Sequence, residues 1–459
     1  MKIPLLLGVS LALPGTALAQ LAGFSWGMSP DYKQAAPSDR AVLLTPFKYL
    51  APAGDKASGR AIKRPPSQQK IADLNAAGDY QAIADQGPAV VASEKTDDGL
   101  QLMVANSLAW TGRAREAMPA YAALTHGEYA DQAFLGIANI DRWQGRDDLA
   151  LPLYQALLDK DPSNGDALEG AAMAAKELAP RTTVGAFGST DSGNMQRRSG
   201  VINHRWRDGS GAQIFELETS AVRDWLPPPA PQATQPELLA RYQHLAMDLK
   251  PSLELELPAR FNRQLFATGR VKLFDDRASI GAGIVNWGRK ATSPNALMAG
   301  LTANYLGADA TGSFDLGSLT GRFDYYDISD SNTILTHSVN FNSAWRPFGS
   351  HFKPFFGLEG RKAKVSTSSY WSPVLGSGTA YAGLMGEWGE SDWNLFASVQ
   401  WGARLYGDAG TSWSASTGGK RWLSSDIAVS ANLWSMASWR DNAAYRAQSL
   451  NVNLEKLWR

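Results

Sequence analysis

Residues 181–459 consist largely of short segments in which apolar and polar side chains alternate. In the clearest segment, 393–406, one face carries Trp393, Leu395, Ala397, Val399, Trp401, Ala403 and Leu405, and the other carries Asn394, Ser398, Gln400, Gly402 and Arg404, with Phe396 as the exception. Because successive side chains of a strand point to opposite faces, this pattern predicts a ribbon with one apolar and one polar side. About sixteen such segments predict a transmembrane β-barrel with lipid outside and a polar lumen inside.

The predicted strands follow one another to the end of the chain, and their boundaries are 182–189, 199–207, 212–221, 243–257, 263–274, 279–288, 295–306, 312–320, 322–328, 337–345, 353–364, 379–388, 393–406, 412–423, 426–439 and 446–458. An even number of strands places both ends of a barrel on one side of the membrane. The segment 222–242, with its five prolines, is then the longest connection, and it is open to interpretation as a plug, a lid or a surface loop.

Two of the predicted strands contain a feature that weakens the pattern. In 243–257 the alternation of leucines with Glu254 and Glu256 is clear, but Pro251 would break one ladder bond. The last strand ends in Trp458, as outer-membrane assembly usually requires, yet Lys456 interrupts its apolar face. Aromatic residues near strand ends predict an interfacial girdle, and these are Trp206, Trp287, Tyr305, Trp388, Trp393 and Trp439.

The N-terminus predicts export from the cytoplasm. Lys2, an apolar run to Leu13 and the small-x-small pattern of 17–19 predict a signal peptide over residues 1–19. No later segment has about eighteen unbroken apolar residues, so no transmembrane helix is predicted. An exported barrel predicts the outer membrane of a Gram-negative bacterium, with the N-terminal domain in the periplasm. Outer-membrane lipid and the barrel assembly machinery are then expected partners.

Composition excludes several classes of function. The 44 basic residues balance the 44 acidic ones, which argues against a nucleic-acid partner. The absence of cysteine excludes thiolate metal sites, and five scattered histidines leave little for any other metal site. His337 and Ser338 are neighbours on a strand and face opposite ways, so they cannot form a catalytic pair. We therefore predict no catalytic residue, no metal and no cofactor.

A helical repeat array precedes the barrel. Residues 20–66 lack a sustained period and predict a flexible leader, whereas 67–180 show ten identities at an offset of 33 residues. Glycine at a turn, alanine at a helix crossing and tyrosine four residues later resemble the tetratricopeptide repeat. The predicted packing residues are Trp110, Gly112, Ala117 and Tyr121, and, one repeat later, Trp143, Gly145, Ala150 and Tyr154. About three repeats stack, since each covers the apolar face of the next, and such arrays usually bind proteins.

The order of the parts resembles the outer-membrane secretins of synthase-dependent exopolysaccharides, the family of cellulose synthase operon protein C and the poly-N-acetylglucosamine porin. Two short motifs support the resemblance. Residues 185–193, Gly-Ala-Phe-Gly-Ser-Thr-Asp-Ser-Gly, are similar to the first barrel strand and turn of that family. Residues 370–373, Tyr-Trp-Ser-Pro, are similar to its Tyr-Phe-Ser-Pro motif. The chain departs from the family in having fewer repeats and Asn194-Met195 in place of Pro-Gly.

The resemblance implies passive export of a polysaccharide chain made by an inner-membrane synthase, in support of a biofilm matrix. Tyr370 and Trp371 are the candidate residues for stacking against sugar rings, although packing in the girdle or in a loop is the more expected role for them. The nearly balanced charge of the barrel favours a neutral polymer such as cellulose. Periplasmic or inner-membrane synthase components are the partners implied for the repeats.

Other functions stay open at this point. Translocators of surface lipoproteins also join tetratricopeptide repeats to a barrel, but fourteen strands are expected there. A receptor or adhesin barrel without transport is compatible with the same sequence. The fold class expected in each case is an α-helical repeat domain followed by an antiparallel barrel.

Overall fold

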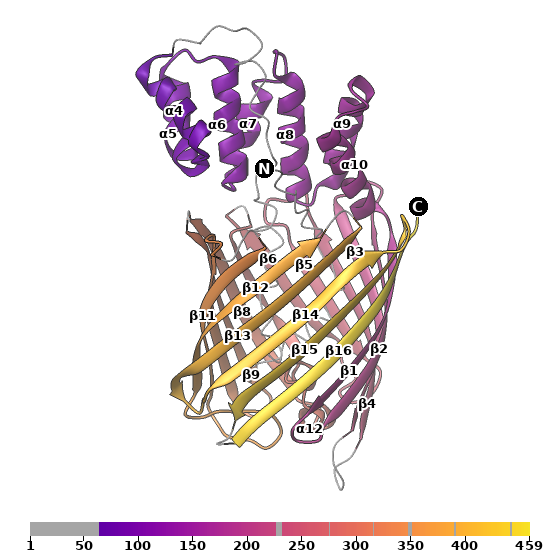
Figure 1. Cartoon of the computed structure of the whole chain (residues 1–459). Helices are drawn as coiled ribbons and strands as arrows, with labels where there is room; N and C mark the ends of the chain where they lie inside the picture. Colours follow the sequence, from indigo (N-terminus) through magenta and orange to yellow (C-terminus); the bar gives the residue numbers. More distant parts are fainter. Residues whose placement is uncertain are drawn as a thin grey trace. The chain divides into compact units, whose positions relative to one another are not determined.

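The computed structural model describes residues 64–225, 232–274, 276–314, 316–347, 351–389, 392–440 and 443–459. The predicted signal peptide and almost all of the predicted leader lie outside these residues. The chain divides into two compact units, a helical one that ends at Ala179 and a barrel that begins at Pro180. Figure 1 shows both units, and the fold class predicted from the sequence is confirmed.

The part of the helical unit that the structure describes, from residue 64 onward, contains three antiparallel helix pairs and one further helix. The helices are α4 (Pro66–Ala77), α5 (Tyr80–Ser93), α6 (Asp98–Trp110), α7 (Ala114–Ala122), α8 (Ala130–Trp143), α9 (Asp147–Lys160) and α10 (Gly165–Leu178). Within the described part of the chain, none of the helices has the length and apolar character that crossing a membrane requires.

The turns inside the helix pairs need glycine. Gly78, Gly112 and Gly145 end α4, α6 and α8 with φ of 76°, 78° and 80°. A side chain at such a φ would meet the backbone, so glycine is the residue that ends a helix there without strain. The three glycines stand 33 or 34 residues apart, at the turn positions of the repeat.

Each of two repeat tyrosines is held between its own repeat and the next. Tyr121 donates a hydrogen bond to Asn106 Oδ1 at 2.6 Å, and Tyr154 donates one to Asn139 Oδ1 at 2.7 Å. The Tyr121 ring also lies against Gly136 of the next repeat, and a Cβ added to Gly136 would stand 2.4 Å from that ring. Because Gly136 has no side chain, it leaves the space that the Tyr121 ring fills.

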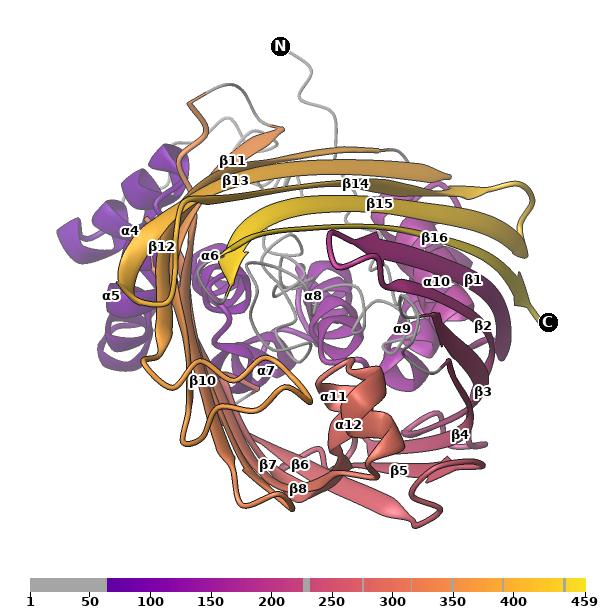
Figure 2. The same cartoon turned by 90° about the horizontal axis from the view of Figure 1, so that it is seen from below.

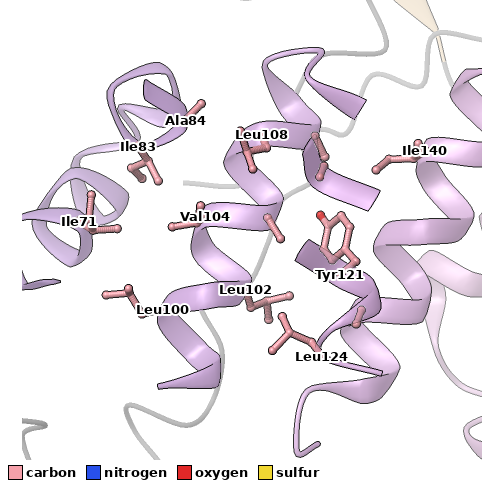
Figure 3. Close-up of a cluster of buried hydrophobic side chains, with 14 residues drawn as sticks. Ile71, Ile83, Ala84, Leu100, Leu102, Val104, Leu108, Tyr121, Leu124 and Ile140 are labelled. Carbon is pink, nitrogen blue, oxygen red and sulfur yellow. The ribbon is translucent and has the colours of Figure 1, made fainter. Parts of the chain in front are cut away.

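The other predicted packing residues lie in or beside the core of the unit. Ala117 and Ala150 are fully buried at the crossings of their helix pairs. Trp143 packs against the main cluster, and Trp110 meets Tyr80 edge to face at 4.6 Å between ring centroids. Figure 3 shows the main cluster, in which Tyr121 lies between leucines of α6 and Ile140 of α8.

Replacing Gly170 with alanine is expected to lower the stability of the helical unit by about 1–3 kcal/mol, the usual cost of overpacking. A Cβ at this site would stand 2.4 Å from the Tyr154 ring. Gly165→Ala in the same helix is the matched control, because nothing lies within 4 Å of its added Cβ. The measurement is thermal loss of the helical circular dichroism of the full chain in detergent. Equal midpoints for the two variants would contradict the packing role.

Stability of the helical unit is expected to depend on pH through Asp141. Burial raises the pKa of this carboxyl to about 6; Asp148 adds to the rise and Arg146 opposes it. The pKa of Asp141 is higher in the folded state than in the unfolded state. The contribution of Asp141 to the free energy of unfolding is therefore complete below the pKa of the unfolded state and is lost as pH rises through 6. The unit should therefore unfold at a higher temperature at pH 4.5 than at pH 7.5, by at most about 3 kcal/mol in stability.

The variant Asp141→Asn should abolish most of this difference. Asp131→Asn is the control, because its carboxylate lies on the surface of the same helix and pairs with Lys160 at 2.6 Å. Thermal unfolding of both variants at the two pH values checks the prediction. A pH dependence that survives in Asp141→Asn would assign it to other carboxyls.

Sixteen antiparallel strands form one closed barrel, in which each strand pairs with its sequence neighbours and β1 pairs with β16. The strands are β1 (Arg181–Asp191), β2 (Gln196–Arg207), β3 (Gln213–Trp225), β4 (Ala233–His244), β5 (Ser252–Pro258), β6 (Phe266–Leu273), β7 (Ala278–Asn286), β8 (Thr302–Phe314), β9 (Gly317–Ile328), β10 (Thr333–Ser343), β11 (Phe352–Ala363), β12 (Ser377–Gly389), β13 (Trp393–Gly407), β14 (Ser412–Trp422), β15 (Ile427–Arg440) and β16 (Ala443–Leu457).

The strand number is as predicted, but two errors cancel within it. The chain turns between β4 and β5, with Lys250 at φ 38° before Pro251. The prediction of a single strand over 243–257 is therefore wrong. Most of 222–242 belongs to β3 and β4 and is not a plug, lid or loop, while 226–231 lie outside the described residues. The separate strands predicted at 312–320 and 322–328 are replaced by the end of β8 and the single strand β9.

The outer surface of the barrel is apolar. Leu395, Val399 and Trp401 of β13 are 44%, 54% and 63% exposed, while Gln400 between them is 3% exposed. The same alternation follows β16, where Leu450, Val452 and Leu454 face outward. An apolar outer face opposite a polar inner face is the pattern of a transmembrane barrel.

Part of the predicted aromatic girdle is wrong. Trp287 is fully buried, and Tyr305 bonds to Asp324 on the inner wall, so neither can face lipid. The inward position of Tyr305 follows from its pairing opposite Tyr326. On the outer face, rings at the ends of β2, β3 and β4 touch in sequence instead, and these rings are His204, Trp206, Phe215 and Tyr242.

The segment 185–193 lies at the seam where the barrel closes. Asp191 ends β1, and its carboxylate accepts hydrogen bonds from the backbone of Gly193 and Met195. Its second oxygen accepts a bond from Tyr445 of β16 at 3.1 Å, and the Ser192 amide donates to the Arg446 carbonyl. The motif therefore ties the first turn to the last strand.

The end of the last strand is joined to both of its neighbours. Lys456, which interrupts the apolar face, forms an ion pair with Asp426 in the β14–β15 turn. Trp458 donates from its ring nitrogen to the Thr182 hydroxyl at 2.8 Å. The positive charge is thus neutralised at the rim of the barrel, so it does not disturb the apolar belt.

Candidate functional site: the barrel lumen

The inner wall from β2 to β9 is charged, and each of the arginines named below is paired with one or more carboxylates. Cross-strand neighbours on one face of a sheet can pair directly, and the register places Arg197 opposite Asp224 and Arg241 opposite Glu216 and Glu254. The pairs joined by ion-pair contacts are Arg197–Asp224, Arg241 with Glu216, Glu218 and Glu254, Arg289 with Glu237 and Glu256, Arg270–Asp309 and Arg322–Asp324.

Arg241 is the centre of the largest of these networks. Its Nε lies 2.6 Å from Glu254 of β5, and its Nη1 contacts Glu216 and Glu218 of β3. Asn203 of β2 donates to Glu216 at 2.7 Å and so extends the network to a fourth strand. One arginine thereby holds three carboxylates that would otherwise repel one another.

The β7–β8 connection folds into the barrel as a short helical hairpin. It comprises α11 (Trp287–Lys290) and α12 (Pro294–Met298), and Figure 2 shows both helices inside the ring of strands. Arg289 anchors the hairpin to the inner wall through Glu237 at 3.1 Å and Glu256 at 2.8 Å. The backbone carbonyl of Thr292 accepts a bond from Arg197 of β2.

Trp287 fixes the other side of the hairpin. Its ring is fully buried, 5.1 Å from the ring of Tyr326 on β9 and 5.3 Å from the ring of Tyr370. The guanidinium of Arg361 on β11 lies 5.9 Å from the Trp287 ring, at cation–π distance. The hairpin therefore narrows the lumen near the end of the barrel opposite Arg181 and Leu457.

Tyr370, a predicted stacking residue, lies in this packed cluster in the loop between β11 and β12. Its side chain is 6% exposed. Its hydroxyl donates to Asp330 at 2.8 Å and accepts from Asn332 at 3.0 Å. Burial, together with the bond to Asp330, raises the pKa of Tyr370 above its ordinary value, so the hydroxyl stays protonated. In the described structure this ring packs against Trp287, and its contact with sugar stays a prediction.

Trp371, the second predicted stacking residue, lies beside Tyr370 with part of its surface exposed. The Arg361 guanidinium stands 5.4 Å from the Trp371 ring, and Arg361 donates to the Trp371 carbonyl at 3.1 Å. The Ser369 carbonyl accepts a bond from Ser293 of the hairpin. The Tyr-Trp-Ser-Pro motif and the hairpin thus form one structure at the narrow part of the lumen.

The inner wall on β14, β15 and β16 has a different character. Among the side chains that the structure describes on these strands, which leaves out residue 440, one charged pair, Lys420–Glu455 at 2.9 Å, points inward near the end that holds Leu457. The other inward positions are mostly small and polar, and they include Ser412, Ser414, Ser416, Ser430, Asn432, Ser438, Ser449, Asn451 and Asn453. Phe396 of β13 and Trp434 of β15 add two rings to this uncharged wall.

Reasoning from sequence missed the hairpin and the difference between the two walls. The hairpin was missed because its first turn continues the apolar run of β7, and Pro294 at the first position of α12 was the available signal. The difference between the walls was missed because a charge count over the whole barrel averages the charged wall with the uncharged one. Counting charges strand by strand on the polar face would have separated them.

Across the described ranges, no group of three or more histidine and acidic side chains is arranged so that it could hold a metal ion. His337 lies near the Tyr406 hydroxyl on the outer face, away from Ser338, which faces inward. The arrangement offers a polar wall, paired charges and a narrow segment, which are the features of a conduit.

No family model matches the sequence, and no curated protein matches it. Among solved structures, a bacterial polysaccharide outer membrane secretin is 12% identical, with 61% of this chain and 99% of that chain covered and a TM-score of 0.49. OccK2 (OpdF) from Pseudomonas aeruginosa is 10% identical over 61% of this chain and 97% of its own, with a TM-score of 0.34. The translocator domain of autotransporter NalP from Neisseria meningitidis is 14% identical over 69% and 98%, with a TM-score of 0.27. All these scores lie below 0.5, so none of the likenesses identifies the function.

Proposed function

We propose that this chain is an outer-membrane channel that exports an exopolysaccharide, with a neutral, cellulose-like polymer favoured. The helical repeats would lie in the periplasm and dock proteins that synthesise or modify the polymer. The residues that would line the path are those of the inner wall, including Trp371 at the narrow segment. Tyr370 would act by supporting that segment, with contact to sugar as a further role.

The observation that best supports export is the inner wall itself. A closed barrel of sixteen strands has room for an aqueous channel, whereas eight strands would be filled by side chains. In these ion pairs five arginines meet eight carboxylates, so the wall is not positively charged and an anionic polymer is disfavoured. A long polymer needs many weak polar contacts that break easily, and such a wall provides them.

Two other functions remain as alternatives. A translocator of surface lipoproteins would be expected to have fourteen strands, and the observed sixteen disfavour it. A receptor or adhesin without transport would not require the polar wall to continue along the lumen. A barrel enzyme would need a catalytic pair, which the positions of His337 and Ser338 do not provide.

Deletion of the gene, followed by complementation with the full-length chain, tests the proposal. The measurement is the chemical identity and amount of each polysaccharide in the extracellular matrix. Loss of one polymer that returns on complementation supports export and names the cargo. If every polymer is unchanged, export is wrong, and display of surface lipoproteins becomes the measurement that distinguishes the alternatives.

A further inference from the structure

The uncharged wall contains polar atoms that form no hydrogen bond with any of the described residues. These atoms are Ser412 Oγ, Asn432 Oδ1, Ser438 Oγ, Ser449 Oγ, Asn451 Oδ1 and Asn453 Oδ1, all on the inner face of three adjacent strands. Asn451 is 1% exposed and Asn453 is 4% exposed. A buried polar atom without a hydrogen bond is costly, so a row of them indicates a surface that is completed by another molecule.

A small pocket lies in the middle of this row. Asn432, Asn451 and Asn453 line it together with Ser430 and the Phe396 ring, and it has room for one hydroxyl-sized group. Gly418 lies behind that ring, since a Cβ added there would stand 2.9 Å from Phe396. Amide oxygens beside an aromatic face offer hydrogen bonds and an apolar platform at one place.

We propose that this uncharged wall, from Phe396 to Asn453, is the track along which the polymer slides, and that it recognises neutral, hydroxyl-rich sugar chains. The inference rests on the proposed export function and adds the wall and the class of polymer. Sugar hydroxyls donate to the unpaired amide and hydroxyl oxygens, and the apolar face of a sugar ring packs on Phe396. Because each contact is single and uncharged, each one breaks easily as the chain advances.

The opposite wall also holds an unpaired amide, that of Gln235 on β4, but its other polar groups are largely charged. The carboxylates around Arg241 and Arg289 are already engaged, so a sugar hydroxyl would have to displace an ion pair. An anionic polymer would need cations that are free to bind it. Among the side chains of β14 to β16 that the structure describes, which leaves out residue 440, Lys420 is the inward cation, and Glu455 neutralises it.

The test is block of ionic current through the full-length protein in planar bilayers, with cellohexaose as the neutral probe and an oligogalacturonate hexamer as the anionic one. The double variant Asn432→Leu, Asn451→Leu removes two unpaired amides and keeps the approximate side-chain volume. We expect it to raise the cellohexaose concentration for half-block roughly tenfold, since one hydrogen bond changes an equilibrium constant several-fold. Asn340→Leu is the matched control, because that inward asparagine on β10 accepts a bond from Tyr381.

The outcomes separate this inference from the proposed function. Block of the wild type by cellohexaose that is weakened in the double variant and retained in Asn340→Leu supports the track. Equal block in the double variant, or stronger block by the anionic hexamer, overturns the track while matrix loss in the deletion strain still supports export. No cellohexaose block of the wild type also overturns it. Phe396→Leu, which keeps every amide, should weaken block as well and serves if the double variant fails to assemble.

Discussion

Replacing Trp287 with alanine is expected to open the narrow segment of the lumen. The Trp287 ring is fully buried against Tyr326 and Tyr370, and removal of such a ring costs about 3–5 kcal/mol. Without this ring, the α11–α12 hairpin loses much of its packing against the inner wall. A Gram-negative strain that carries the variant should then become sensitive to vancomycin, a hydrophilic antibiotic too large for ordinary porins. The measurement is the minimal inhibitory concentration.

Trp401→Ala is the matched control for this experiment. It removes the same side chain from the outer face of β13, where Trp401 is 63% exposed, and leaves the lumen unchanged. The two variants must reach the membrane in equal amounts, which a surface immunoblot establishes. Unchanged resistance of the Trp287→Ala strain at equal expression would show that the hairpin stays in place through Arg289, or that it does not limit passage.

The barrel was predictable where each strand has one apolar and one polar face. In β13 and β16 the alternation is nearly complete, because one face meets lipid and the other faces the lumen. The alternation gave a wrong prediction at β4 and β5, because Leu245 and Met247 continue it through a turn. A two-residue period cannot show that the chain has reversed direction, and Pro251 was the local signal that it had.

The functional site was less predictable, because it depends on contacts between residues far apart in the chain. The Tyr-Trp-Ser-Pro motif was found from the sequence, but its packing partner Trp287 lies 83 positions before Tyr370 (370 minus 287) and was assigned to the girdle. Likewise, the repeat tyrosines were found, whereas Gly136 and Gly170, which accept them, were not. Gly136 and Gly170 stand 34 residues apart (170 minus 136), which is the spacing of the repeat, so this recurrence was the available signal for the two positions.

Replacing Arg241 with methionine is expected to change both the stability and the ion selectivity of the barrel. Glu216, Glu218 and Glu254 would lose their shared cation inside the lumen. Removing one partner of a buried pair costs about 3–5 kcal/mol, and three partners are affected here. A folded barrel migrates faster than the unfolded chain on a gel in detergent. The temperature at which this faster band disappears should fall. The unbalanced carboxylates should also shift the reversal potential in a salt gradient towards that of K⁺.

The control is Arg241→Met combined with Glu254→Gln, which removes one of the three carboxylates together with the arginine. Because Arg241 bonds to Glu254 through Nε at 2.6 Å, the pair is deleted as a unit and the local net charge returns to that of the wild type. Selectivity should recover in this double variant, whereas Glu216 and Glu218 still repel each other and the stability recovers in part. If the single variant melts and conducts like the wild type, solvent already screens these carboxylates, and Arg241 does not set the ion selectivity of the lumen.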